Sequence, residues 1–130
     1  MSVARLILPA SFSLLTACAQ QPRHSIELEN QSQCPVFLSV GQTITLQLPT
    51  NPSTGYRWLV QNPGASVLRS LGPEVYSTPE AEAVIGAAGQ STWRFQARTA
   101  GKGHLMLVLQ QPWAPEVPPV QAFDCDIDVQ

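Results

Sequence analysis

Two histidines, His24 and His104, are the imidazole groups that this 130-residue sequence offers for acid–base catalysis. His24 lies in a polar segment near the start and His104 lies in an apolar run, so neither stands beside a candidate nucleophile. Ser53 lacks the Gly-x-Ser-x-Gly setting of a hydrolase, and the histidines and cysteines show no metal-ligand spacing. The sequence therefore argues against an enzyme, and it predicts no cofactor and no metal.

Asp124, Asp126 and Asp128 form the one acidic series whose chemistry would suit calcium. Alternate positions of a strand share one face, but the glycine turn of a calcium loop is missing from this stretch. We interpret the series as the solvent-facing side of a strand.

Cys18 closes the motif Leu15-Thr16-Ala17-Cys18, which resembles the bacterial lipobox. The apolar run from Leu6 to Leu15 has the length of a signal-peptide core and is too short to span a bilayer. We therefore predict a lipoprotein signal peptide over residues 1–17, lipid attachment at Cys18 and a tether over residues 18–25. The alternative is a plain secretory signal in which Cys18 has no role.

Ala19 follows the cysteine where an aspartate would favour another destination, and this indicates the outer membrane of a Gram-negative cell. The protein is expected to be anchored in the cell envelope, facing the periplasm or the exterior. No other run is long and apolar enough to bind a membrane, so lipid is the only membrane contact that the sequence predicts.

Cys34 and Cys125 remain as a possible disulfide in an oxidising compartment. The bridge would tie the start of the folded part to its last strand, and two buried free thiols are the alternative. Removal of residues 1–17 takes Arg5 from the seven basic residues and leaves six against nine acidic ones. Without a basic cluster, the sequence predicts no nucleic-acid partner.

Period-two alternation of apolar and polar residues runs through the chain after about residue 25 and predicts an all-β domain. The alternating stretches are 43–48, 56–60, 93–97 and 123–129, and the stretch 105–109 is apolar on both faces, as in a central strand. Glycine and proline turns separate them. Short strands at this spacing predict one immunoglobulin-like β-sandwich over residues 26–130, expected to be a monomer.

The turn from Asn51 to Tyr56 is the first candidate for a binding site. Pro52 fixes its own φ and favours an extended residue before it, and Gly55 can take a positive φ. The polar side chains of the turn can bond nearby backbone. Such a turn is ordered before it meets a partner, which reduces the entropy lost on binding. An ordinary hairpin corner is the alternative.

Trp113 is the second candidate, because it stands between prolines in the segment 111–115. Rigid exposed aromatic residues are favoured anchors at interfaces. The alternative is that Trp113 folds back over the sandwich edge and plugs the core. The third candidate is a glycine-flanked loop that runs from Val84 to Gly89.

Together these loops resemble the chagasin family of cysteine-protease inhibitors, whose members carry three motifs in order: Asn-Pro-Thr-Thr-Gly-Phe, Gly-x-Gly-Gly and Arg-Pro-Trp. The corresponding stretches here are Asn51-Pro52-Ser53-Thr54-Gly55-Tyr56, Gly86-Ala87-Ala88-Gly89 and Gln111-Pro112-Trp113. The resemblance extends over about Val36 to Val129.

The resemblance implies a reversible, non-covalent inhibitor whose three loops form a wedge in the cleft of a papain-like cysteine peptidase. By position, Ser53 and Thr54 would approach the catalytic thiolate. Ile85, Gly86 and Ala87 would follow one side of the cleft, and Pro112 and Trp113 would lie on the opposite wall, near the catalytic histidine.

Two positions depart from the family's pattern. Gln111 stands where the family usually has arginine, and Ala88 stands where it has glycine. We expect both departures to change affinity or the range of targets more than the activity itself. The alternative function is an adhesion or assembly module of the cell envelope that uses the same sandwich for a partner other than a protease.

Overall fold

The structure is a computed structural model that describes residues 4, 7, 9–11, 13, 25–78 and 89–130. Cys18 and most of the predicted signal peptide lie outside the described residues, and so do Ile85, Gly86, Ala87 and Ala88. Among the described residues, no helix is long and apolar enough to cross a membrane.

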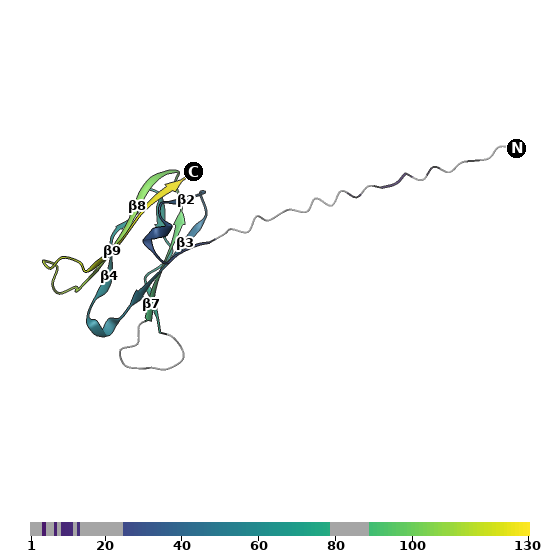
Figure 1. Ribbon diagram of the computed structural model, residues 1–130. Helices are drawn as coiled ribbons and strands as arrows, with labels where there is room; N and C mark the ends of the chain where they lie inside the picture. Colours follow the sequence, from purple (N-terminus) through teal and green to yellow (C-terminus); the bar gives the residue numbers. More distant parts are fainter. Residues whose placement is uncertain (1–3, 5–6, 8, 12, 14–24, 79–88) are drawn as a thin grey trace.

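Two β-sheets pack face to face and confirm the predicted immunoglobulin-like sandwich (Figure 1). The first sheet has the order β1-β3-β7-β5. Strand β6 also pairs with β7, along an earlier part of β7 than β5 does. Its strands are β1 (Ile26–Leu28), β3 (Thr43–Thr50), β5 (Leu68–Ser70), β6 (Val75–Ser77) and β7 (Gly89–Ala97).

The second sheet has the order β2-β9-β8-β4. Its strands are β2 (Val36–Leu38), β4 (Arg57–Pro63), β8 (Gly101–Gln110) and β9 (Gln121–Val129). Two short 3₁₀ turns complete the described elements, η1 (Gln31–Gln33) and η2 (Pro52–Thr54). The chain therefore begins in the first sheet with β1 and crosses to the second with β2.

Period-two alternation fills the core between the sheets, as the sequence predicts. The inward residues of β3 and β7 face those of β8 and β9, and all of them are buried. They are Ile44, Leu46, Leu48, Trp93, Phe95, Leu105, Leu107, Phe123, Cys125, Ile127 and Val129. On the other face of β8, Val108 is buried and Met106 is half-buried, so the two-sided burial predicted for this strand is partly present.

The alternation predicted for residues 56–60 fails at Val60, which is 41% exposed although Trp58 is buried. The pairing of β4 with β8 shifts register between Val60 and Asn62. Trp58 pairs with Leu109 and Val60 pairs with Leu107, so both keep the same face of the sheet, and the bulge that follows Val60 adds a residue and bends the strand. Strand β4 continues to Pro63, and the turn predicted around residues 62–64 falls at Gly64, with φ 66°.

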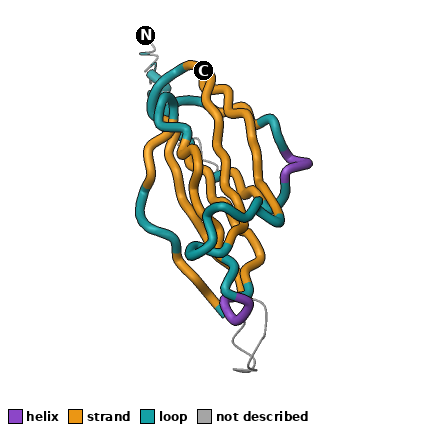
Figure 2. The backbone as a smooth tube through the Cα atoms, turned by 90° about the vertical axis from the view of Figure 1, so that its left-hand side faces the viewer, coloured by secondary structure: helices purple, strands orange, loops and turns teal. Residues whose placement is uncertain are grey.

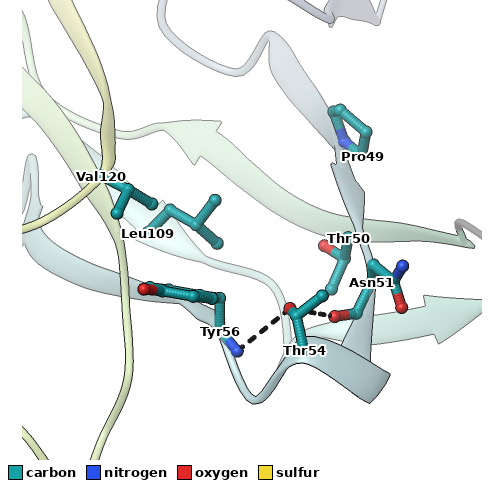
Figure 3. Close-up of a pocket in the computed structure, with 7 residues that line it drawn as sticks. All are labelled: Pro49, Thr50, Asn51, Thr54, Tyr56, Leu109 and Val120. Atoms are coloured by element: carbon teal, nitrogen blue, oxygen red, sulfur yellow. Dashed lines mark hydrogen bonds between the residues drawn. The ribbon is translucent and has the colours of Figure 1, made fainter.

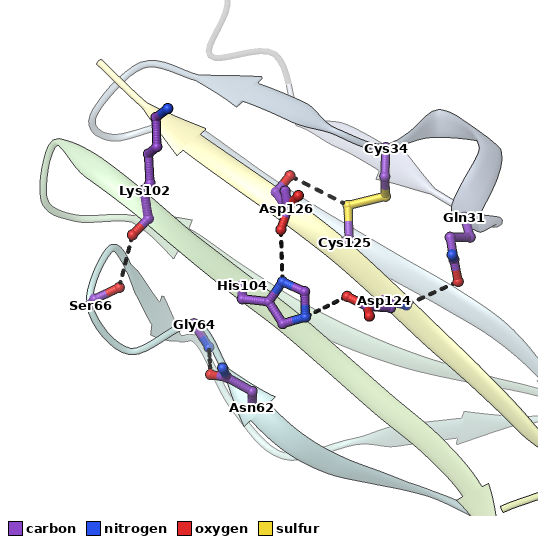
Figure 4. Close-up of polar contacts among 10 residues, drawn as sticks. All are labelled: Gln31, Cys34, Asn62, Gly64, Ser66, Lys102, His104, Asp124, Cys125 and Asp126. Atoms are coloured by element: carbon purple, nitrogen blue, oxygen red, sulfur yellow. Dashed lines mark hydrogen bonds and ion pairs between the residues drawn. A yellow bond between two sulfur atoms is a disulfide. The ribbon is translucent and has the colours of Figure 1, made fainter.

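A disulfide joins Cys34 to Cys125, with a Cα–Cα distance of 5.4 Å and a sequence separation of 91 residues (Figure 4). The bridge confirms the pairing expected from the sequence. It fastens the segment between β1 and β2 to the central part of β9, so the switch of the chain from one sheet to the other is covalently tied to the core.

Candidate functional site

The turn between β3 and β4 is organised by Asn51. Its backbone is extended, and its side-chain Oδ1 accepts hydrogen bonds from the Ser53 N–H at 3.2 Å and the Ser53 hydroxyl at 2.6 Å. The Thr54 hydroxyl donates to the Asn51 carbonyl at 2.8 Å, and Gly55 closes the turn at φ 79°. These features confirm the conformation expected from the sequence, in which prolines, short polar side chains and glycine fix the backbone together.

Pro52, Ser53 and Thr54 form the single 3₁₀ turn at the tip and are all exposed. Figure 2 shows this turn at one extreme of the sandwich, with the C-terminus at the other. The tip therefore projects from the domain on a pair of strands.

The base of the turn is held by buried polar contacts. The indole N–H of Trp58 donates to the Pro49 carbonyl at 3.0 Å, which joins the last part of β3 to β4. The Thr50 hydroxyl bonds to the Ser91 hydroxyl at 3.0 Å, and Ser91 donates to the carboxylate of Glu74. Because Thr50 and Ser91 are almost fully buried, these bonds also satisfy groups that would otherwise be costly to bury.

The loop between β8 and β9, residues 111–120, carries the third motif. Within it, the Ala114 N–H donates to the Gln111 carbonyl at 3.1 Å, and the Val117 N–H donates to the Ala114 carbonyl at 3.1 Å. The side chain of Trp113 is 68% exposed. The alternative in which Trp113 plugs the core is therefore wrong.

Trp113 nevertheless lies against the first motif. A Cβ added to Gly55 would overlap the indole ring, with Cζ2 at 3.1 Å and Cζ3 at 3.3 Å. The absence of a side chain at Gly55 thus lets the ring pack directly on the turn. The first and third motifs, separated by more than fifty residues, form one continuous surface at this end of the sandwich.

A hollow of about 220 Å³ opens between the turn and the β8–β9 loop (Figure 3). Tyr56 lies along one side of the hollow, Leu109 and Val120 close another side, and Thr50 and Thr54 line the part nearest the turn. The hollow has a mixed but uncharged lining, which suits contact with a protein surface more than the capture of an ion.

The second motif is described only at its last residue. Gly89 is buried at the start of β7, where it pairs with Thr50. A Cβ there would come within 2.6 Å of the Ser77 carbonyl oxygen and of Cε2 of Tyr76, so the close packing of β6 requires glycine. Ser77 pairs with Gln90 and Gly89 pairs with Thr50, so the described residues on either side of the segment 79–88 lie beside the end of β3.

Sequence reasoning missed the contribution of Gln110, the last residue of β8. Its side chain is 8% exposed, and its amide donates to the Pro115 carbonyl at 3.1 Å and to the Val117 carbonyl at 2.9 Å. The available signal was parity, because Gln110 continues the face of Met106 and Val108 in an apolar strand.

His104 lies away from this site, six residues before the end of β8. Its Nδ1 is 2.8 Å from Asp126, and its Nε2 pairs with Asp124 (Figure 4). The cross-strand pairing of His104 with Asp126 explains the cluster, and no group of metal-binding side chains occurs in the part of the chain that the structure describes. At about 3.3 Å per residue, the cluster is about 20 Å from the β8–β9 loop.

Comparison with known proteins shows what this arrangement is similar to. Residues 38–127 match the family model described as chagasin family peptidase inhibitor I42. Amoebiasin-1 of Entamoeba histolytica is 26% identical over 102 residues, which cover 78% of this chain and 96% of the relative. Chagasin of Trypanosoma cruzi is 27% identical over 81 residues, which cover 58% of this chain and 71% of the relative.

A solved structure has the same fold. The crystal structure of EhICP2, a cysteine protease inhibitor of Entamoeba histolytica, superposes with a TM-score of 0.67 at 20% identity. The superposition covers 82% of this chain and 98% of that protein.

Proposed function

The chain belongs to the chagasin family of peptidase inhibitors, and we propose that it blocks the cleft of papain-like cysteine peptidases, as a monomer, with three loops at one end of its sandwich. The loops are the β3–β4 turn, the segment ending at Gly89 and the β8–β9 loop. The protein is an inhibitor, not an enzyme, and the inhibition is reversible and non-covalent.

The observation that carries this proposal is the packing of Trp113 on Gly55. An exposed indole on a rigid turn provides a large apolar contact area without the entropy cost of ordering two separate loops. An envelope adhesion module would not need these two motifs to meet, so the contact favours a wedge.

A papain-like site holds a thiolate beside an imidazolium in an open groove. Ser53 and Thr54 occupy the exposed tip and would approach the thiolate. Their backbone is a 3₁₀ turn closed by a left-handed Gly55, so it does not present an extended peptide in a geometry that favours attack. The tip can therefore fill the catalytic position without being cleaved.

The motif residues that the structure describes, Asn51–Tyr56 and Gln111–Trp113, carry no formal charge. Insertion into a cleft would then require little desolvation of ions, and apolar burial and shape supply the affinity. Pro112 and Trp113 would lie on the cleft wall near the catalytic histidine. Gln111 offers a hydrogen bond at this wall in place of the cation that the family often has there.

Titration of the purified protein into papain and into a cathepsin-L-like peptidase, followed by peptide hydrolysis, tests this function. Reversible inhibition at one inhibitor per active site is expected, with full recovery of activity on dilution. The inhibitor should survive incubation uncleaved. Absence of inhibition of both peptidases at micromolar concentration would contradict the proposal and would favour the adhesion alternative.

We also propose that Cys18 carries lipid and that the domain is anchored in the cell envelope, at the outer membrane. The support is the lipobox-like motif at the end of an apolar run in the sequence. Cys18→Ser should abolish incorporation of labelled palmitate and release the protein from the membrane fraction. Unchanged labelling in the Cys18→Ser variant would reject the anchor.

A further inference from the structure

Four prolines interrupt the β8–β9 loop, at positions 112, 115, 118 and 119. A proline has no N–H, so it cannot donate a hydrogen bond to the loop backbone. Residues 111–120 therefore have few backbone donors with which to fix their own conformation.

The buried side-chain amide of Gln110 supplies hydrogen-bond donors to this loop. It reaches two carbonyls of the same loop, those of Pro115 and Val117, at 3.1 and 2.9 Å. These acceptors lie five and seven residues further along the chain, so one side chain fixes the arc of the loop that begins with Trp113. The main chain closes the same arc where the Val120 N–H donates to the Leu109 carbonyl at 3.0 Å.

Burial makes these two bonds effective. Gln110 is 8% exposed, so its amide has little access to water as a substitute partner. Pro115 and Val117 are exposed residues, so their carbonyls can be hydrated if the amide is lost. Loss of the Gln110 donors should accordingly loosen the loop without unfolding the sandwich.

We infer that Gln110 is a positioning residue for Trp113: its buried amide holds the β8–β9 loop in the arc that lays the indole on Gly55 before a peptidase arrives. The effect of this role on inhibition rests on the proposed function, whereas its effect on the loop does not. The two parts can therefore be tested separately.

The test of the loop is amide hydrogen exchange of Ala114, Val117 and Val120, measured by NMR in the wild type and in Gln110→Met, which removes the donors at similar length. Exchange of these amides should accelerate about tenfold, because the two bonds that restrain the arc are lost. Amides in the centre of β8 and β9 should be unaffected. Unchanged exchange at Ala114 and Val117 would overturn the inference.

Gln96→Met is the matched control. Gln96 is a half-buried glutamine whose amide likewise donates to a carbonyl, that of Gly41 at 3.3 Å, but it lies at the opposite end of the sandwich. The control should leave exchange in the β8–β9 loop at the wild-type rate. Acceleration in both variants would mean a general loss of stability and would count against a specific role of Gln110.

Gln110→Glu provides a second variant of the same size. Its carboxylate cannot donate at neutral pH, but the protonated carboxyl can donate below a pH of about 4. Relative to the wild type at each pH, the loop should exchange faster at pH 7 and recover towards the wild-type rate in acid. If the exchange rates of the variant and the wild type differ equally at both pH values, the side-chain donor of residue 110 has no role in holding the loop.

A double-variant cycle tests the link to Trp113. Gln110→Met should raise the inhibition constant for papain about tenfold. In a Trp113→Ala background, the same change should alter it by less than about twofold, because there is no longer an indole to position. Additive effects would reject positioning. A wild type that does not inhibit would reject the proposed function, and the exchange result would still decide the role of Gln110.

Discussion

The indole of Trp113 packs so closely on Gly55 that a side chain at position 55 would overlap it. This contact joins the first and third motifs, which the sequence presents as separate loops. It also makes glycine necessary for two reasons, because φ is 79° at this residue and because the ring occupies the space of a Cβ.

Gly55→Ala should destabilise the protein by about 1–2 kcal/mol through its positive φ and should also displace Trp113. Gly41→Ala is the matched control, since Gly41 has φ 95° but nothing within 4 Å of an added Cβ. Both variants should lose stability in urea unfolding, and only Gly55→Ala should weaken inhibition. Equal inhibition by the two variants would show that the ring contact has no part in binding.

Trp113→Ala should weaken the free energy of binding to the peptidase by about 2 kcal/mol or more, the size expected for an aromatic anchor at an interface. The inhibition constant should rise accordingly. Its effect on the free energy of unfolding should be small, because the side chain is 68% exposed. Inhibition assays and urea unfolding of the same preparation measure both quantities. An unchanged inhibition constant would mean that the loop is only structural.

Trp58→Phe removes the indole N–H that donates to the Pro49 carbonyl. The variant should lose about 1 kcal/mol more stability than Trp93→Phe, which removes the same ring volume from another buried tryptophan. The difference between the two, read from urea unfolding, reports the hydrogen bond. A smaller loss in Trp58→Phe than in Trp93→Phe would contradict its role in holding the turn.

A free-thiol count on the purified domain, residues 26–130, should read zero, because Cys34 and Cys125 form a bridge. The paired substitution of both cysteines by serine should lower the free energy of unfolding by about 4–5 kcal/mol on the chain-entropy account, given the long loop that the bridge closes. Two titratable thiols in the wild type would refute the bridge.

The sequence predicts β3, β7 and β9 well because each has one face in the core and one in solvent, which creates strict alternation over many residues. The strands β1, β2, β5 and β6 have three residues each, too few for alternation to be seen. They exist because longer partners offer hydrogen-bonding edges: β1 pairs with β3 and β2 pairs with β9. Their stability is tertiary and is not encoded locally.

The candidate site also has parts that local sequence encodes and parts that depend on tertiary contacts. The Asn51–Tyr56 turn follows from local chemistry, so its conformation could be predicted. The role of Gln110 could not, since a glutamine at the end of an apolar strand looks like the start of a solvent-exposed loop. Only the folded chain shows that a proline-rich segment with few donors covers its amide, on the face of β8 that carries Met106 and Val108. Likewise, the contact between Trp113 and Gly55 depends on the pairing of β4 with β8.

The parallel pairing of β1 with β3 places the start of both strands at the same end of the sandwich. Ser25 bonds to Thr45 near the start of β3, and the strand then runs on to the turn at Asn51, a rise of about 20 Å at about 3.3 Å per residue. Ser25 therefore lies towards the end of β3 that is remote from the β3–β4 turn. With the lipid that we propose at Cys18, the β3–β4 turn would lie on the side of the domain away from the membrane, where a peptidase in solution would reach it first.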